Sequence, residues 1–362
     1  MLVILHRFFD NSNMTKKKRN IINNFINPKI SKDPIWEMAM AFQVSKALFL
    51  ANNLDIFTLL SRKPETAEAI AKKLKLQSRP VERLLNAMSA FGLLKKKVGK
   101  YYNTDMSETF LVKGKPEYFG NYLNAINEVY RAWSDYEKVL ENNSSIPLFR
   151  KEYAEGQEVI RKMMLAQEGF SFRQAAYLPE IYDFSGHRLL LDVGGGTGIF
   201  SVMAVNANPA LRSIIFDVPP VCAIARERIK LYKAEKKIKI MEGNFITDKL
   251  PQGADAALLS TILDAYDDND CRHLIKKVFD SLKPGGTIIA NEMMLNKEGT
   301  GPLFPAIFSL ELMIERNRGN SRKIDEIKGW MKDAGFTKIK CRPLWLKGET
   351  YLNCWIVTGK KR

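Results

Sequence analysis

Apolar residues recur at helical spacing through the first third of the chain, starting near Ile35. A second helix is predicted from Pro64, because proline followed by acidic residues is typical of a helix start. A third helix is predicted from Ser78, and a lysine-rich hairpin around Gly99 follows it. Helix, turn, helix and a two-stranded wing predict a mainly α-helical winged-helix domain over residues 33–112.

The pattern remains helical over residues 113–178, and we expect a helical linker and substrate-pocket roof there, although aromatic stripes like those of this segment are more often core or dimer contacts than a ligand wall. After Pro179, strands and helices alternate, which predicts a mostly parallel sheet with helices on both faces over residues 179–362. The expected strands are residues 189–193, 213–217, 238–241, 255–260 and 287–292, with a closing hairpin over 345–357. These segments indicate an α/β domain of the Rossmann-like type.

Composition excludes several classes of protein. With 46% hydrophobic and 27% charged residues, the chain can fold as a globular protein. The four cysteines form no Cys-x-x-Cys pair and the three histidines lie far apart, so neither a disulfide scaffold nor a metal site is expected. No apolar run reaches the roughly 18 residues of a membrane-spanning helix. The short apolar start does not resemble a signal peptide, and we expect a cytoplasmic protein.

Charge is concentrated near the amino terminus. The formal net charge is +16, and residues 1–110 hold 19 basic and 9 acidic side chains. Residues 1–32 include four consecutive basic residues from Lys16 and are predicted to form a flexible basic arm. A basic amino-terminal third suits nucleic acid or another anionic surface, but it also suits solvated lysine-rich faces. Charge alone favours the solvated faces.

A glycine-rich turn, Asp192-Val-Gly-Gly-Gly-Thr-Gly, joins an apolar strand to a predicted helix. The missing side chains at Gly194 and Gly196 let a ligand lie against the backbone, and the helix start offers free amides. Nicotinamide-binding folds use a related turn, in which the glycines stand further apart. Asp192 precedes the glycines, where a carboxylate favours an ammonium group and repels a pyrophosphate. The turn therefore predicts a cofactor with an ammonium group.

Polar and aromatic residues follow the next two strands. Asp217 ends the second strand, where a carboxylate can accept hydrogen bonds from ribose hydroxyls. Nicotinamide cofactors use the same geometry, so Asp217 alone does not discriminate between cofactors. After the third strand, Asn244 can pair with an adenine edge and Phe245 can stack on the ring.

Four motifs in order resemble the S-adenosylmethionine-dependent O-methyltransferase family, which includes plant phenolic and bacterial polyketide enzymes. They are the glycine turn at Asp192, Asn-Pro-Ala-Leu-Arg from Asn208, Phe-Asp-Val-Pro from Phe216 and Leu-Lys-Pro-Gly-Gly from Leu282. The resemblance covers the chain from Ile35 to its end. It implies a class I methyltransferase fold with a seven-stranded sheet and a winged-helix domain that forms a homodimer. It also implies S-adenosylmethionine as the cofactor, S-adenosylhomocysteine as its product, and no metal.

The resemblance also implies roles for individual residues. The glycines would face the methionyl part of the cofactor, Asp217 would bind ribose, and residues 244–245 would flank adenine, although the family more often has Asp at position 244. Ser171 resembles a cofactor-contacting serine, and Ser260 stands where the family often has lysine. The expected cofactor contacts are Asp192, Gly194, Gly196, Asp217, Asn244, Phe245, Ser260 and Ser171.

The family's catalytic histidine has no counterpart here. In the family, the loop after the fourth strand reads Leu-His-Asp-Trp, and its histidine deprotonates the acceptor. Here Asp264 stands in the histidine's place, Glu292 matches one supporting glutamate, and Ser321 replaces the other. We take Asp264 and Glu292 as the candidate catalytic residues. The three histidines, His6, His187 and His273, are expected at the surface.

The chemistry of Asp264 is open at this stage. A carboxylate with a pKa near 4 facing a phenol near 10 must overcome about 6 pKa units. Burial can raise the pKa of a carboxyl by roughly 3–5 units, which would close much of that gap. Alternatively, the acceptor is a thiol, thioether, amine or carbon that needs little help, or Asp264 only caps the following helix.

Several apolar residues in the segments that surround the acceptor in the family are candidates for the substrate pocket, with ordinary core packing as the alternative. They are Trp133, Met163, Met164, Phe308, Leu312 and Met313. Thioether side chains suit a planar apolar substrate.

The leading hypothesis is a homodimeric methyltransferase of secondary metabolism that acts on a small planar metabolite, with a hydroxyl oxygen as the favoured acceptor. Carbon or sulfur methylation is the alternative, since a bacteriochlorophyll-pathway branch of the family also lacks the histidine. In a few relatives the cofactor remains as a scaffold for decarboxylation or hydroxylation. A winged-helix DNA-binding regulator is a more distant alternative, because the would-be reading helix offers few base-contacting side chains.

Overall fold

The computed structural model describes residues 31–143, 145, 156–315, 318–344 and 354–362. Contacts divide the chain into two compact units, residues 1–112 and 113–362. Most of the predicted basic arm, His6, and most of the predicted closing hairpin lie outside the described residues.

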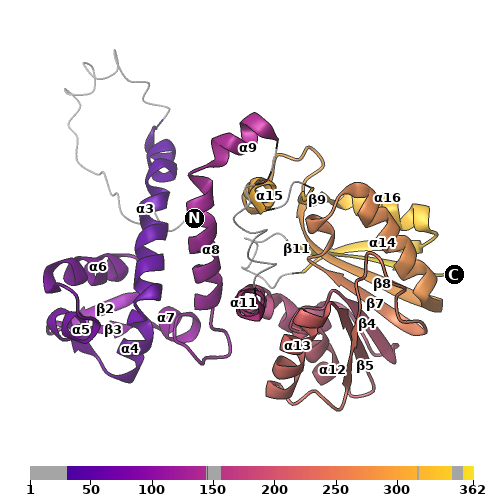
Figure 1. Cartoon of the computed structure of the whole chain (residues 1–362), viewed down its shortest axis with the longest axis horizontal. Helices are drawn as coiled ribbons and strands as arrows, with labels where there is room; N and C mark the ends of the chain where they lie inside the picture. Colours follow the sequence, from indigo (N-terminus) through magenta and orange to yellow (C-terminus); the bar gives the residue numbers. More distant parts are fainter. Residues whose placement is uncertain (1–30, 144, 146–155, 316–317, 345–353) are drawn as a thin grey trace, which may run out of the picture. The chain divides into compact units, whose positions relative to one another are not determined.

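The first unit is mainly helical (Figure 1). Its helices are α3 (Asp33–Asn53), α4 (Ile56–Arg62), α5 (Ala67–Leu74), α6 (Ser78–Ala90) and α7 (Asp105–Phe110), and its strands are β1 (Glu65–Thr66), β2 (Leu94–Lys97) and β3 (Lys100–Asn103). The strands form one small sheet in the order β1-β3-β2. Helix α6 buries Val81, Leu85 and Met88, which lie three or four residues apart on one face. The helix, turn, helix and hairpin expected from the sequence are therefore present.

One helix start differs from the prediction. The helix expected from Pro64 begins at Ala67, because the two preceding residues pair with β3 as the short strand β1. The hydroxyl of Thr66 then accepts a hydrogen bond from the Ala69 amide, at 3.3 Å, and caps the helix. Strand pairing, which a local pattern cannot show, shifts the start by one turn.

The second unit contains a mostly parallel sheet, as predicted. Its strands are β4 (Leu189–Val193), β5 (Arg212–Asp217), β6 (Ile238–Glu242), β7 (Ala254–Ser260), β8 (Leu282–Leu295), β9 (Arg322–Lys323), β10 (Thr337–Pro343) and β11 (Cys354–Lys360). The order is β10-β11-β8-β7-β4-β5-β6, and the short β9 pairs with the end of β8. Strands β4 to β8 are parallel, whereas β10 and β11 are antiparallel. The closing hairpin therefore begins earlier than expected.

Helices cover both faces of this sheet (Figure 1). They are α11 (Gln157–Ile181), α12 (Ile199–Ala207), α13 (Pro219–Leu231), α14 (Asp268–Ser281), α15 (Leu303–Glu315) and α16 (Ile324–Ala334). Helix α8 (Gly120–Trp133) packs against α11 and α15, and α9 (Tyr136–Asn142) packs against α15. Neighbouring residues of β4 enter opposite cores, since Leu190 packs with α11 to α13 and Leu191 packs with α14 and α16. Because β4 to β8 are parallel, their carboxyl ends meet at one edge, where such sheets bind ligands.

One residue expected at the surface is buried. His187, just before β4, is 8% exposed, and its Nε2 lies 2.8 Å from the Tyr182 hydroxyl. Its Nδ1 lies 3.6 Å from the Asp255 carboxylate. Burial lowers the pKa of His187, and Asp255 opposes that effect. The expectation of a surface location was wrong for His187, whereas His273 is exposed as expected.

The buried imidazole should make stability depend on pH. Because the pKa of His187 is lowered in the folded protein, its contribution is present above the unfolded value of about 6.5 and is lost as the pH falls through the folded value. We expect wild type to lose stability relative to H187Q as the pH falls from about 7.5 to 5.5. Urea unfolding at several pH values measures this difference, and a constant difference would contradict the prediction.

Candidate active site

A cavity of about 730 Å³ lies in the second unit, at the carboxyl ends of the parallel strands. This volume is within the range of ligand-binding sites, which is roughly 300–1,000 Å³. Residues from α8, α11 and α15, the glycine turn, and the segments that follow β5, β6 and β7 form its walls.

The glycine turn presents its backbone to the cavity. Gly194 and Gly196 both have positive φ angles, of 66° and 57°, which other residues rarely adopt. A Cβ atom at Gly194 would lie 2.5 Å from the Cδ1 of Ile262, so a side chain there would displace Ile262 as well as strain the backbone. At Gly196 only the sulfur of Met164 comes within 4 Å, at 3.8 Å, so the space in front of this backbone belongs to the cavity. The turn therefore fits a ligand that lies against the main chain.

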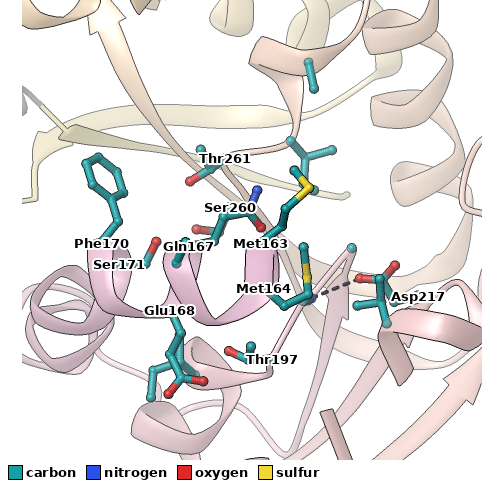
Figure 2. Close-up of a pocket in the computed structure, with 18 of the residues that line it drawn as sticks. Met163, Met164, Gln167, Glu168, Phe170, Ser171, Thr197, Asp217, Ser260 and Thr261 are labelled. Atoms are coloured by element: carbon teal, nitrogen blue, oxygen red, sulfur yellow. Dashed lines mark hydrogen bonds between the residues drawn. The ribbon is translucent and has the colours of Figure 1, made fainter. Parts of the chain in front are cut away.

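Asp217, at the end of β5, is held in place by two backbone amides. Its Oδ2 accepts a hydrogen bond from the Gly196 amide at 3.0 Å, drawn as the dashed line in Figure 2, and its Oδ1 accepts one from the Val218 amide at 2.8 Å. Burial raises the pKa of Asp217, and these two hydrogen bonds oppose that effect. A carboxylate oxygen has two lone pairs, so each oxygen can accept a further hydrogen bond from a ligand hydroxyl.

Asp192 lies inside the wall of the cavity and does not line it. Its Oδ2 accepts a hydrogen bond from the Ser201 hydroxyl of α12 at 2.6 Å, and Ser201 in turn contacts Ser213 of β5 at 2.8 Å. Burial raises the pKa of Asp192 to about 6. The sequence suggested that Asp192 meets the ammonium group of a cofactor, but in the structure its carboxylate lies behind the cavity wall. It links β4 to α12 because its side chain points toward that helix.

The loop after β6 brings an amide and an aromatic ring to the cavity. Asn244 and Phe245 both line it, as expected. The ring of Phe245 meets the ring of Tyr266 edge to face, with centroids 5.6 Å apart. Tyr266 also lines the cavity, so this end offers two aromatic rings and one amide to a flat heterocycle.

Helix α11 forms one wall. Met163, Gln167 and Ser171 lie four residues apart on one face and line the cavity, and Figure 2 shows them opposite Ser260 and Thr261 at the end of β7. Met164 and Glu168 lie beside them on the same helix. Sequence reasoning missed Gln167 and Glu168, although both stand one turn after predicted methionines and helical spacing could have found them.

A buried ion pair holds this wall in position. Glu168 is 6% exposed and accepts hydrogen bonds from Arg228 Nε, at 3.0 Å, and from the Tyr232 hydroxyl, at 2.8 Å. Because both partners belong to the region of α13, the pair fixes α11 against that helix. The methionines of α11 are thereby held over the glycine turn.

The two candidate catalytic carboxylates lie behind the wall. Asp264 is 4% exposed, Glu292 is 1% exposed, and neither lines the cavity. Glu292 Oε1 accepts hydrogen bonds from the amides of Ile262, at 2.9 Å, and Leu263, at 2.8 Å. Burial first, and then the neighbouring Asp264 carboxylate, raise the pKa of Glu292 well above its usual range. The geometry assigns Glu292 to supporting the loop after β7.

Arg322 holds the same loop from its other side. It is 3% exposed, its Nε donates to the Leu263 carbonyl at 2.9 Å, and its Nη2 donates to the Tyr266 carbonyl. Its Nη1 donates to Asp268 at 2.7 Å. The loop contributes Ile262, Ala265 and Tyr266 to the cavity, so buried charges position this part of the wall.

The predicted substrate residues divide into two groups. Met163, Met164 and Phe308 line the cavity, whereas Trp133, Leu312 and Met313 do not. Trp133 stacks on Tyr136 with ring centroids 5.3 Å apart, and the Tyr136 hydroxyl lies 3.8 Å from the sulfur of Met313. On α15 the cavity-facing positions are Phe308 and Glu311, and the two residues after Glu311 point elsewhere because each helical residue turns by about 100°.

Several side chains that line the cavity were not predicted. They are Tyr122, Ala125, Ile126, Val129, Thr197, Thr261, Met293, Glu311 and Arg318. Thr261 has a positive φ of 56°, which is unusual for a β-branched residue and typical of functional sites. Sequence alone gives no signal for this conformation.

Two further features bear on the class of protein. Within the described ranges, no three His, Cys, Asp or Glu side chains gather as they would around a metal ion. Among the helices that the structure describes, none is both long and apolar enough to cross a bilayer.

Parallel strands, a glycine turn and an acidic residue at the end of the second strand are shared by class I methyltransferases and nicotinamide-binding folds, and the comparisons with known proteins decide between them. The O-methyltransferase domain family matches residues 126–337, and the O-methyltransferase dimerisation domain family matches residues 36–113. The chain therefore belongs to the O-methyltransferase family. The predicted resemblance is confirmed, and so are the fold class and a methyltransferase activity that depends on S-adenosylmethionine.

Curated relatives and solved structures agree with this assignment. The chain is 30% identical to 3-hydroxy-5-methyl-1-naphthoate 3-O-methyltransferase of Streptomyces sahachiroi, over 84% of this chain and 90% of the relative. It is 32% identical to acetylserotonin O-methyltransferase of Bos taurus, over 84% and 92%. Human N-acetylserotonin methyltransferase in complex with SAM has a TM-score of 0.82 at 23% identity, with 97% and 99% of the chains covered. PigF with SAH has a TM-score of 0.80 at 25% identity, with 92% and 100% covered.

Glutamine at position 292 should be tolerated. Since the raised pKa favours a neutral side chain, Glu292→Gln keeps the charge state and one oxygen for both amides, and we expect turnover within about threefold of wild type. Glu292→Leu leaves the amides of Ile262 and Leu263 without that acceptor and should lower the free energy of unfolding by about 2–6 kcal/mol. Steady-state kinetics and urea unfolding measure both effects. A loss of about 100-fold in the stably folded glutamine variant would instead show that an ionised Glu292 takes part in catalysis.

Proposed function

We propose that this enzyme transfers the methyl group of S-adenosylmethionine to a hydroxyl oxygen of a small planar aromatic metabolite. One observation carries the proposal: a single cavity joins a polar end, at the glycine turn and Asp217, to an aromatic end. At the aromatic end, Tyr122 stacks on Phe170 with centroids 4.8 Å apart, and Phe308 lies nearby in the same wall. Donor and acceptor can therefore meet in one cavity.

At the polar end the residues fit the cofactor. We assign the methionyl part to the backbone of Gly194 and Gly196, the ribose to Asp217, and the adenine to Asn244 and Phe245. Ser171 of α11 and Ser260 of β7 also line the cavity, and we propose that they contact the cofactor. When bound, S-adenosylmethionine supplies an electrophilic methyl group on a sulfonium. The protein contributes alignment and the exclusion of water, which an in-line displacement needs most.

At the aromatic end the lining residues fit a flat acceptor. Tyr122, Phe170 and Phe308 give ring surfaces against which a planar molecule can pack. Met163 and Met164 add thioether surfaces beside the glycine turn, where the two ends of the cavity meet. The names of the relatives support oxygen as the acceptor atom, since they act on a hydroxy-naphthoate and on acetylserotonin. We propose a hydroxylated aromatic compound of secondary metabolism, and a cytoplasmic location remains a prediction.

Loss of the Asp217 carboxylate should weaken cofactor binding. Hydrogen bonds to a charged group contribute about 1.5–3 kcal/mol each, so Asp217→Ala should raise the Kd for S-adenosylmethionine roughly 10- to 100-fold. Asp192→Asn is the matched control, because Asp192 does not line the cavity, and its Kd should stay within about twofold of wild type. Calorimetry measures both constants, and an unchanged Kd for Asp217→Ala would overturn the ribose assignment.

Transfer of label tests the reaction itself. Wild type, given methyl-labelled S-adenosylmethionine and a hydroxynaphthoate, should place the label in a methyl ether. Release of the demethylated cofactor without a labelled ether would overturn oxygen methylation.

We also propose that the first unit is a winged-helix dimerisation domain over residues 33–112, with residues 113–178 as the pocket roof and 179–362 as the catalytic domain. The dimerisation-domain match supports a homodimer. Helix α3 adds support, because large apolar side chains are exposed along it, and exposed apolar patches mark interaction sites. They are Ile35, Trp36, Met38, Phe42 and Leu50.

Two negative charges on the exposed apolar side of α3 should prevent dimer formation. Trp36→Glu combined with Phe42→Glu would bury unpaired carboxylates in the interface, and we expect light scattering to report a monomer of 41.3 kDa. Val98→Glu is the control, because Val98 is exposed in the hairpin turn and should leave the dimer intact. A wild-type monomer, or a variant dimer of unchanged affinity, would contradict this arrangement.

A further inference from the structure

A carboxylate lies at the aromatic end of the cavity. Phe304, Phe308 and Glu311 stand four and three residues apart on α15 and therefore share one face. Phe304 lies between Phe170 and Phe308, with ring centroids 6.1 and 6.0 Å away, and both of those rings line the cavity. Glu311 lines the cavity one turn further along the same face and is half-buried. Glu311 thus continues the aromatic wall.

The other carboxylates of the cavity serve the polar end or the framework. Glu168 is bound by Arg228 and a tyrosine. Asp217 is bound to the glycine turn. Asp270 lies in the first turn of α14, just after Tyr266, and Tyr266 packs on Phe245 at the adenine end. Of the carboxylates that line the described cavity, Glu311 is the one grouped with the aromatic residues.

Imidazole, the usual base for this chemistry, does not line the described cavity. His187 precedes β4 at the opposite edge of the sheet, His273 is exposed on α14, and His6 lies outside the described residues. Asp264, in the position of the family's histidine, is buried behind the wall. The proton acceptors offered by the described walls are carboxylates.

From this arrangement we propose that Glu311 accepts the proton of the acceptor hydroxyl, and that the natural acceptor is an acidic hydroxyl conjugated to an electron-withdrawing group. The inference rests on the proposed function. A carboxyl with a pKa near 4.3 takes a proton from a phenol near 10 with an equilibrium constant of roughly 10⁻⁶. For a hydroxyl with a pKa of about 7, the constant is roughly 10⁻³, which catalysis overcomes far more easily.

The step balances as follows. The O–H bond of the acceptor breaks, and its proton moves to a carboxylate oxygen of Glu311. The oxygen uses the freed electron pair to form the O–CH₃ bond while the S–CH₃ bond breaks, and that electron pair remains on sulfur. The products are a methyl ether, a neutral thioether and a protonated Glu311, which returns its proton to water.

Glu311→Gln separates this role from a structural one. The substrates are naphthols that carry a nitro group, a formyl group or no electron-withdrawing group. Wild-type turnover should rise with the acidity of the naphthol. Below the pKa of the naphthol, Glu311→Gln should lose about 100-fold in kcat, because no side chain takes the proton. Above that pKa the acceptor arrives ionised, and the loss should shrink to about threefold or less.

Three controls accompany this variant. Glu128→Gln, at an exposed position of α8, should behave as wild type at every pH. Glu311→Asp keeps the carboxylate and should retain the wild-type pH profile at reduced kcat. The Kd for S-adenosylmethionine should be unchanged in all three variants, because Glu311 lies at the other end of the cavity from the glycine turn.

The outcomes distinguish this inference from the proposed function. Equal kcat for wild type and Glu311→Gln below the pKa of the naphthol overturns the role of Glu311, and so does a loss of the same size at every pH. Equal turnover of all three naphthols overturns the acidic acceptor. If wild type binds S-adenosylmethionine but methylates no naphthol oxygen, the proposed function fails, and this inference fails with it.

Discussion

One carboxylate joins the two segments on which the cofactor end depends. Asp217 binds the amide of Gly196 in the glycine turn and the amide of Val218 after β5. Two backbone hydrogen bonds, from the Gly194 amide to Phe216 and from the Gly198 amide to Gly195, also hold the turn. No side chain of its glycines can help, and Asp217 is the side chain that binds the amide of Gly196. Because the same carboxylate faces the cavity, the group that orders the turn also offers oxygens to a ligand. Binding and local structure are therefore coupled at this position.

The loop after β7 shows how the site can lose the family's histidine and keep its shape. Asp264 and Glu292 are both buried, and two adjacent negative charges in such surroundings are unfavourable, so the pKa of Glu292 is raised. Arg322 offsets part of this cost and binds two carbonyls of the loop. The loop is thus held by hydrogen bonds to its main chain, which do not require a particular side chain at position 264.

The sequence predicted the order of the elements and the residues of the glycine turn, because both follow from local periodicity and backbone angles. It did not predict the direction of individual side chains. Asp192 stands next to the glycines, yet it points to Ser201, which the sequence places nine residues away. Leu312 follows a cavity residue directly, yet it faces away by the turn of a helix. Such directions depend on how the elements pack against one another. Neighbouring residues of one element can point to the cavity and to the core, so an error of one residue exchanges the two.

Proton acceptance and loop support make opposite demands on a carboxylate. A group that supports a buried loop works best when it is shielded from water and neutral, as the surroundings of Glu292 favour. A group that accepts a proton must be ionised beforehand, which requires contact with water or with a polar ligand. Glu311 is half-buried at the cavity wall and meets that second requirement. Because the proton acceptor lies on α15, Asp264 and Glu292 can support the loop after β7 without also having to accept a proton.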